Sequence, residues 1–377
     1  MNHDSDIEAI RTQFPVVDQW TYLYNGSIHP QPAPVVRAMH DFIGAWAEGG
    51  EAAFPQGMDS FLELREQLAR LIGGKASNVV VTESTTSALN LAHGLVRPTS
   101  DQNVVLDELT FMTNTYPWLL SGLAGPDVRF VPEVAGSIDI SDLRAALDPA
   151  TALLSISAVA VSSGFRHDLG AVSEVAAAAG VPVLADGAQA VGVIDIDLGE
   201  TPIDFLAGTA SKWLMGPAGV GFLHLADQYL AATPPSLGWL AAANVGDWDL
   251  RHGVLHEDAM RFQGGIPNFI GVVGSLAALR FRDEVGDQFI KSRIAELTTY
   301  LVDELRTLGA DLWTPEPAAH RAGIVFFRSP RAAEIHDRLR SERIYTGTFM
   351  GGIRCDPSFY NTHTELDRFL SVVAPLL

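Results

Sequence analysis

The sequence of 377 residues carries 45 acidic against 25 basic side chains, a formal net charge of −20 at pH 7. A protein this acidic repels a phosphate backbone, so nucleic acid is excluded as an expected partner. Almost half of the residues, 47%, are hydrophobic, which excludes global disorder and allows a sizeable core. Among the basic residues, Lys75, Lys212 and Lys291 are the lysines, so chemistry that needs a side-chain amine has three candidates.

The sequence favours a cytoplasmic protein without a membrane span. The single cysteine, Cys355, leaves no partner for an internal disulfide and fits a reducing compartment. The first 15 residues are polar and acidic, unlike a secretory signal. Apolar runs break at Asp, Gly or Pro before they reach the roughly 18 residues that a membrane helix needs.

The central part of the chain alternates short β-branched runs with amphipathic helical segments. The runs expected to form buried strands are residues 79–82, 103–108, 128–133, 152–159, 181–186, 203–209 and 219–225. Helical patterns lie between several of them, at residues 87–95, 140–147 and 169–180. This alternation predicts an α/β fold with a mostly parallel sheet covered by helices on both faces.

After about residue 270 the pattern changes to an α+β arrangement. Long helices are expected at 272–286 and 290–309, short strands within 322–329 and 352–358, and a last helix at 363–376. We therefore predict a large domain over residues 16–265 and a small C-terminal α/β domain over residues 266–377. Residues 1–15 are expected to pack across both as an arm.

One lysine stands where imine chemistry is plausible. Lys212 follows the predicted strand 203–209 and precedes a glycine-rich turn, so its amine is expected to be partly desolvated, with a lowered pKa. Asp186 ends another apolar strand, where a carboxylate is costly without a cationic partner, and Gln189 follows three residues later. Alone, such an aspartate equally suits a ribose or a metal. Together the three residues suggest pyridoxal phosphate, with an amine for its aldehyde, a carboxylate for its ring nitrogen and an amide for its phenolic oxygen.

Four blocks of the sequence resemble the class V aminotransferase family of fold-type I pyridoxal phosphate enzymes, which includes cysteine desulfurases and isopenicillin N epimerase-like proteins. They are VVVTESTTSALNLAHGL (79–95), the Asp186–Gln189 pair, TASKWLMGPAGVGFL (209–223) and GGIRCDPSFYNTHTELDRFL (351–370). The order and spacing match the family over roughly residues 20–370. The resemblance implies a large cofactor-binding domain, a small C-terminal domain and a homodimer with its sites at the interface.

The resemblance also implies roles for individual residues. The phosphate would be held by the turn containing Ser84, Thr85 and Thr86, together with Thr209 and Ser211. Lys212 would form the imine, and Arg354, in a block that resembles the family's Arg-x-Ser-x-x-x-Tyr-Asn, would bind the substrate α-carboxylate. Asn25 and Gly26 would lie near the substrate. Phe111, or Met112 if the register differs by one, would stack on the pyridine ring; packing in the core is the alternative for this aromatic residue.

The chain departs from the family pattern at several positions. Ser211 stands where many relatives have a histidine before the lysine. Ile266 replaces a threonine thought to reach the neighbouring subunit's phosphate, which leaves the backbone N–H of Gly265 as the possible donor. Desulfurases have a histidine in place of Phe111 and a catalytic cysteine well before the Arg354 block, whereas this chain has only Cys355, interpreted as structural.

These departures favour one reaction class. With no histidine over the ring, acid–base work near the substrate Cα falls mainly to Lys212, which suits β-elimination from an S-cysteinyl conjugate, as in tailoring enzymes of lincosamide antibiotic pathways. The alternatives are an aminotransferase or decarboxylating or oxidative deaminase of a bulky amino acid, an epimerase, and a non-catalytic binding protein that keeps the cofactor fold.

Other motifs receive weaker interpretations. His252 and His256 beside Glu257 are interpreted as solvated or hydrogen-bonded residues, so no metal site is predicted. Ser163–Gly164 is expected near the cofactor. The stretch 239–248 is expected either to shape a substrate pocket or to pack in the core.

Overall fold

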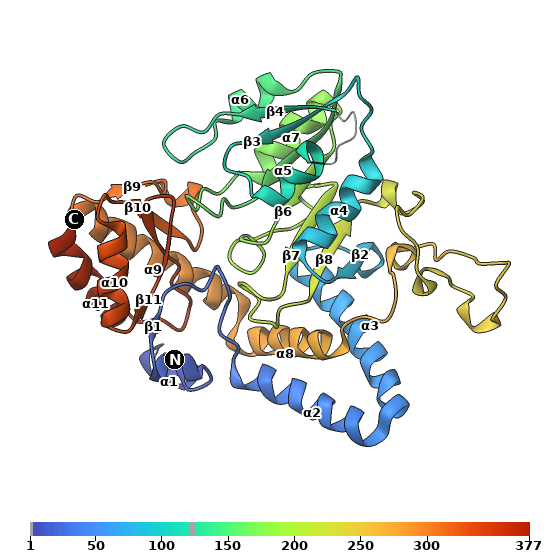
Figure 1. The fold of residues 1–377 in the computed structure, drawn as a ribbon, viewed down its shortest axis with the longest axis horizontal. Helices are drawn as coiled ribbons and strands as arrows, with labels where there is room; N and C mark the ends of the chain where they lie inside the picture. Colours follow the sequence, from blue (N-terminus) through green and yellow to red (C-terminus); the bar gives the residue numbers. More distant parts are fainter. Residues whose placement is uncertain (1–2, 121–125) are drawn as a thin grey trace.

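A twisted sheet forms the centre of the computed structural model, which describes residues 3–120 and 126–377 (Figure 1). Within these residues the sheet has seven strands in the order β2-β8-β7-β6-β5-β3-β4. Their bounds are β2 (Val79–Thr82), β3 (Asn103–Asp107), β4 (Asp127–Val131), β5 (Thr151–Ser157), β6 (Val183–Asp186), β7 (Phe205–Thr209) and β8 (Gly221–Leu225). β3 to β7 pair in parallel and β8 pairs antiparallel with β2 and β7, which confirms the predicted mostly parallel sheet.

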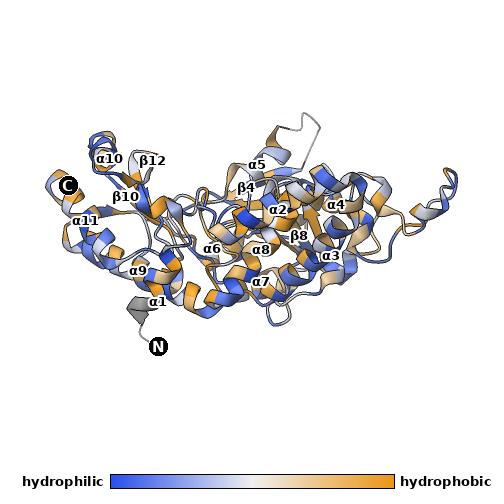
Figure 2. Ribbon diagram, turned by 90° about the horizontal axis from the view of Figure 1, so that it is seen from below, coloured by the Kyte–Doolittle hydropathy of each residue, from blue (hydrophilic) through white to orange (hydrophobic). Residues whose placement is uncertain are grey.

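Both faces of this sheet are covered by helices. Successive side chains of a strand point to opposite faces, so neighbouring residues of one strand belong to different cores. In β3, Val105 belongs to the core shared with α3 (Phe54–Leu71), α7 (Leu169–Ala179) and α8 (Phe269–Val285). Val104 and Leu106 belong instead to the core shared with α4 (Thr85–Val96) on the other face. Figure 2 shows the resulting apolar interior between the layers.

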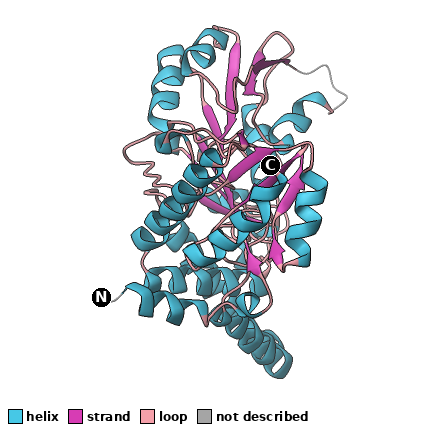
Figure 3. Ribbon diagram, turned by 90° about the vertical axis from the view of Figure 1, so that its left-hand side faces the viewer, coloured by secondary structure: helices cyan, strands magenta, loops and turns pink. Residues whose placement is uncertain are grey.

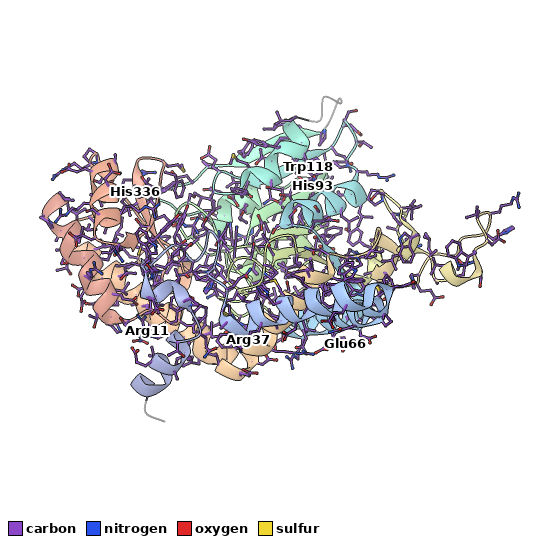
Figure 4. The ribbon with its side chains drawn as sticks, turned by 60° about the horizontal axis from the view of Figure 1, so that its bottom comes forward. Arg11, Arg37, Glu66, His93, Trp118 and His336 are labelled. Atoms are coloured by element: carbon purple, nitrogen blue, oxygen red, sulfur yellow. The ribbon has the colours of Figure 1, made fainter. Side chains whose placement is uncertain are left out.

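α8 contacts two further helices, α2 (Ala33–Gly49) and α3. α2 packs along α8 beside α3, and the exposed Arg37 and Glu66 lie on the outward faces of α2 and α3 (Figure 4). The shorter helices α5 (Met112–Leu119) and α6 (Ile140–Ala146) follow β3 and β4.

The C-terminal part has a separate core. α9 (Asp287–Thr307) begins after Gly286, whose φ of 98° allows the break from α8. A four-stranded antiparallel sheet follows among the described residues, in the order β12-β13-β10-β9 (Figure 3). Its elements and the two helices beside it are β9 (Asp311–Leu312), β10 (Val325–Arg328), α10 (Ala332–Ser341), β12 (Gly347–Phe349), β13 (Gly352–Cys355) and α11 (His363–Val373). The predicted domain bounds remain a prediction.

The amino-terminal segment connects the two parts. α1 (His3–Arg11) ends on the C-terminal part, where Arg11 Nη1 donates to Glu365 Oε2 at 2.9 Å and to the Tyr360 carbonyl at 2.8 Å. Phe14 is fully buried and stacks on Tyr360 with ring centroids 4.4 Å apart. The short strand β1 (Thr21–Tyr22) then pairs in parallel with β11 (Ile344–Tyr345).

A long loop extends away from the body between β8 and α8 (Figures 1 and 4). Leu240 and Ala241 on it are buried, whereas Trp239 and Trp248 are 45% and 87% exposed, so only part of the stretch 239–248 packs in the core, and its role in a substrate pocket stays a prediction. The cause is local sequence: glycine, asparagine and aspartate interrupt the apolar residues, and no helix or strand period forms. No helix among residues 3–120 and 126–377 combines the length and apolarity that crossing a membrane requires.

Candidate active site

Lys212 and Asp186 come together at the carboxyl-terminal edge of the parallel sheet, where α/β proteins place their ligands. Asp186 is the last residue of β6, and Lys212 lies three residues after β7. The loop that carries Lys212 is tightened by hydrogen bonds from Gly216 N to the Ala210 carbonyl and from Met215 N to the Lys212 carbonyl, at 2.8 and 2.9 Å. The strand ends therefore fix both side chains on one side of the sheet.

The electrostatics of this pair match the sequence-based expectation. Burial lowers the pKa of Lys212 to about 8, while the nearby Asp186 carboxylate opposes that shift. Burial raises the pKa of Asp186, and Lys212 together with the N–H of Ala188 acts in the opposite direction. An amine with a pKa near 8 has a substantial unprotonated, nucleophilic fraction at neutral pH.

A cavity of about 160 Å³, called the smaller cavity below, opens beside this pair. Its wall consists of Ser84, Thr85, Thr86, Phe111, Thr113, Ser157, Val159, Val161, Asp186, Ala188, Gln189 and Lys212. α4 begins at Thr85, and the Ser84 hydroxyl caps it by accepting from Ser87 N at 3.1 Å. Because that oxygen is used inside the helix cap, the first N–H groups of α4 and the Thr85 and Thr86 hydroxyls are the groups that suit an anion.

Phe111 forms one wall of the smaller cavity. It stands directly before α5, its backbone N–H donates to Ser157 Oγ at 3.1 Å, and its side chain is 38% exposed. Met112, the alternative residue for stacking, does not line this cavity and lines instead a larger cavity beside it. The position of Phe111 therefore suits a flat ring better than that of Met112. Ser157, which sequence reasoning missed, fixes this register.

Gln189 links the lysine loop to the amino-terminal segment. Its Oε1 accepts from Trp213 Nε1 at 2.9 Å, and its Nε2 donates to the Gly26 carbonyl at 2.8 Å. An amide nitrogen carries two hydrogens, so one remains for a ligand oxygen in the smaller cavity. Contact of Gln189 with the phenolic oxygen of the cofactor remains a prediction.

The remaining predicted phosphate ligands lie further from the smaller cavity. Thr209 Oγ1 donates to the Val220 carbonyl at 3.2 Å and lies 3.3 Å from Ser211 Oγ, and neither residue is among those lining the cavity. Gly265 and Ile266 are exposed on the loop before α8. Their roles toward the phosphate, in this chain or across a dimer, stay predictions.

A larger cavity of about 660 Å³ adjoins the smaller one through Lys212, Phe111, Val161 and Gln189, which line both. Its other lining residues are Tyr24, Gly26, Ser27, Glu108, Leu109, Thr110, Met112, Ser162, Trp313, Phe349, Met350 and Arg354. These residues come from the amino-terminal segment, the large sheet and the C-terminal part. Ser163, predicted near the cofactor, is buried and donates to the Gly136 carbonyl at 2.8 Å, whereas Ser162 faces the cavity.

Asn25 and Gly26, both predicted to lie near the substrate, have different surroundings. Asn25 is fully buried; its Nδ2 donates to the Asp356 carbonyl at 2.8 Å, and its Oδ1 accepts from the Tyr360 hydroxyl at 2.7 Å. Gly26 lines the larger cavity, whereas Asn25 does not. The Asn25 side chain therefore fastens the amino-terminal residues 22–32, called the entrance segment below, to the C-terminal part. The substrate role of Asn25 remains a prediction.

Arg354 lines the larger cavity from β13 and is already paired. Its Nε donates to Asp356 Oδ1 at 2.9 Å, and its Nη2 lies 2.7 Å from Asp356 Oδ2. Both side chains are at least 97% buried, and burial raises the pKa of Asp356 while Arg354 opposes the rise. Sequence reasoning missed Asp356, although it stands at the serine position of the family's Arg-x-Ser-x-x-x-Tyr-Asn block.

The site residues fit pyridoxal phosphate. The smaller cavity joins a helix N-terminus for a phosphate, a buried carboxylate for a pyridine nitrogen, a flat aromatic wall and a lysine amine of lowered pKa. This donor set matches the separate functional groups of that cofactor. The chain would hold it with Thr85 and Thr86, Asp186, Phe111 and Lys212.

Comparison with known proteins agrees with this fit. The cysteine desulfurase of Dickeya dadantii (strain 3937) is 29% identical over 343 residues, 86% of this chain and 82% of that protein. The isopenicillin N epimerase of Streptomyces clavuligerus is 30% identical over 339 residues, 83% of this chain and 84% of that protein.

A solved structure shares the fold over nearly the whole chain. A C-DES variant with glycine covalently linked to its pyridoxal phosphate cofactor has a TM-score of 0.90 and 24% identity, over 97% of this chain and 98% of that one. The same protein, described as a cystine C-S lyase, has also been solved with its product cysteine persulfide, with a TM-score of 0.88 and 24% identity over 96% of this chain and 99% of that one. The family model for class-V aminotransferases matches residues 21–367. The chain belongs to the class V aminotransferase family and is a pyridoxal phosphate-dependent enzyme.

Proposed function

We infer that this enzyme cleaves a C–S bond by β-elimination in an S-cysteinyl conjugate. The observation that carries the proposal is the position of Lys212 at the junction of the two cavities, combined with the location of the single cysteine. Cys355 lies fully buried on β13 and lines neither cavity, and burial raises the pKa of its thiol. A persulfide-forming desulfurase needs a reactive thiolate in reach of the substrate sulfur, which a buried, protonated thiol does not provide.

The residues of the chain divide the work between the two cavities. Pyridoxal phosphate, when bound, supplies an electron sink for negative charge that develops at the substrate Cα. Asp186 would keep a proton on the pyridine nitrogen, and Phe111 would line the face of the ring. Lys212 takes the proton from Cα, after which the bond between Cβ and sulfur breaks and the thiolate leaves with the electron pair. The larger cavity orients the conjugate and has room for a sulfur substituent.

The alternatives within the family differ in the product and not in the first proton transfer. The relative named isopenicillin N epimerase supports epimerisation, which requires a second proton donor on the opposite face of Cα. An aminotransferase or a decarboxylating or oxidative deaminase would use the same Lys212 and release a keto acid or an aldehyde that still carries sulfur. A non-catalytic binder would keep the fold without turnover.

One product analysis separates these reactions. S-Methyl-, S-benzyl- and S-hexyl-cysteine are supplied to the holoenzyme, and pyruvate, free thiol, sulfur-containing keto acid or aldehyde, and D-isomer are quantified. Pyruvate and thiol in equal amounts support the proposal. Sulfur-containing carbonyl products, D-isomer or no product would overturn it. The predicted homodimer, cytoplasmic location and place in lincosamide-type antibiotic tailoring remain predictions.

A further inference from the structure

The substrate wall of the larger cavity contains a cation whose charge is already compensated. Arg354 faces this cavity, and Asp356 lies behind it, fully buried and outside the set of lining residues. Nε donates a hydrogen bond to Oδ1 at 2.9 Å, and Nη2 lies 2.7 Å from Oδ2 as an ion-pair contact without hydrogen-bond geometry. In the family block quoted above, the position of Asp356 belongs to a serine, which carries no charge.

The backbone around the pair keeps it together. A side-chain carbon added to Gly26 would lie 2.5 Å from Arg354 Nη2 and 2.9 Å from Asp356 Oδ2, so the chain packs directly against both groups. The Asp356 N–H donates to the Leu23 carbonyl at 2.7 Å, which fixes this aspartate to the entrance segment. These contacts hold Asp356 beside Arg354 in the described structure.

Hydrogen-bonding capacity remains on Arg354 although its charge is balanced. A guanidinium has five N–H donors, and Nε is the one hydrogen-bonded to Asp356, so the hydrogens on the two Nη atoms remain available. A neutral carbonyl oxygen can accept from Nη1 without any change in charge. A carboxylate at the same place would add a second negative charge to a buried one-to-one pair, and a buried charge without its own counter-charge is costly.

No other cation in the described residues of this wall replaces the lost charge. Apart from Arg354, the charged residues lining the larger cavity are Glu108 and Lys212. Glu108 is negative, and Lys212, which lines both cavities, would be bonded to the cofactor aldehyde in the resting holoenzyme. This wall has no net positive charge, yet it offers hydrogen-bond donors to an acyl group of the substrate.

We propose that Asp356 is a specificity-determining residue that removes the preference of Arg354 for a free α-carboxylate. The enzyme then accepts conjugates whose carboxyl group is an amide or ester as well as it accepts the free acid. This inference rests on the proposed function in one respect, that the larger cavity binds the substrate. It extends the substrate class to cysteine S-conjugates with a blocked carboxyl group.

A binding experiment tests the inference without turnover. 3-(Methylthio)propanoate and 3-(methylthio)propanamide lack the amino group, so neither can react with the cofactor. Their dissociation constants are measured by calorimetry on the holoenzyme, on Asp356→Ser and on the isosteric Asp356→Asn. Asp337→Asn, at an exposed aspartate of α10, is the matched control.

The wild type is expected to bind the acid and the amide with constants within about threefold of each other, because the net charge of the Arg354 pair is zero. Asp356→Ser and Asp356→Asn should tighten acid binding by about tenfold or more and leave amide binding within about threefold, because Arg354 regains an uncompensated charge. A wild type that binds the acid about tenfold tighter than the amide overturns the inference. Variants that leave this ratio unchanged also overturn it.

The ratio of the acid and amide dissociation constants of the wild type tests the inference even if the variants fail to fold. Because no reaction is measured, these constants hold whether or not C–S cleavage is found. Thiol release together with a preference for the acid would contradict only the role of Asp356. The expected binding ratio without thiol release would contradict only the proposed C–S cleavage.

Discussion

The two cavities of the site are built in different ways. The smaller cavity takes most of its wall from the ends of consecutive strands and the first turn of α4, within residues 84–212. The larger cavity combines the entrance segment near Gly26, the loop after β3 and the C-terminal strand β13, which are far apart in the sequence. Chemistry common to a family is therefore held by local strand–loop–helix units, whereas substrate selection depends on how three segments meet.

Removal of the amine should have the largest effect and should act on both cavities. Lys212→Ala is expected to reduce turnover by about 10⁴-fold or more, since imine formation and proton transfer at Cα are lost together. The measurement is product formation together with the visible absorbance of the bound cofactor. Lys75→Ala, at a lysine about 68% exposed and paired with Asp227, is the matched control and should leave both unchanged. Turnover that survives in Lys212→Ala would contradict the central assignment.

A methyl group at position 26 should affect the larger cavity more than the smaller one. The added carbon of Gly26→Ala would lie 2.5 Å from Arg354 Nη2 and 3.0 Å from Gln189 Oε1. Overpacking of this kind costs about 1–3 kcal/mol, so we expect kcat/KM to fall by about 10- to 100-fold. Cofactor affinity, measured by absorbance titration, should fall by less than about threefold, because only Gln189 is shared with the smaller cavity among the groups that the methyl group meets. Gly44→Ala on α2, where the added carbon meets nothing within 4 Å, is the control. Equal losses in both measurements would erase the distinction between the cavities.

The pH dependence of cofactor capture reports on the smaller cavity. Lys212 reacts as the free amine, and burial lowers its pKa to about 8. The rate of holoenzyme formation from the apoprotein should therefore rise about tenfold per pH unit below about pH 8 and level off above it. Asp186 raises this pKa, so Asp186→Asn should move the plateau to lower pH. A rate that rises steadily to pH 10 would indicate an ordinary exposed lysine.

The aromatic wall should give the smallest change. Phe111→Ala is expected to weaken cofactor binding by about 3- to 10-fold, because an aromatic contact contributes about 0.5–1.5 kcal/mol beyond its buried area. Dissociation constants from dialysis give the comparison. Met112→Ala should leave cofactor affinity intact, and Phe130→Ala on β4, at an aromatic residue 42% exposed, is the matched control. A larger loss in Met112→Ala than in Phe111→Ala would reverse the assigned register.

The sequence predicts the smaller cavity better than the larger one. The strands of the main sheet, and the placing of Lys212 and Asp186 at its edge, follow from hydrophobic runs and the alternation with helices. For the stretch 239–248 the sequence left two alternatives open, because tryptophan and leucine there have no regular spacing that would indicate where they pack. Asn25 was predicted to lie near the substrate and that role stays a prediction, but the sequence did not indicate its side-chain hydrogen bonds to the Asp356 carbonyl and to Tyr360, more than 300 residues away.

The sequence by itself determined the α/β fold and the cofactor and predicted the lysine, because each depends on residues close together in the chain. A strand end, a helix N-terminus and a turn impose their geometry within a few residues. Only the tertiary structure decided the charge of the substrate wall. Arg354 lies on β13 and Asp356 follows directly after its last residue, and the backbone of Gly26 packs against their pair through parallel contacts of the amino-terminal segment with the C-terminal part. Such long-range packing has no local sequence pattern.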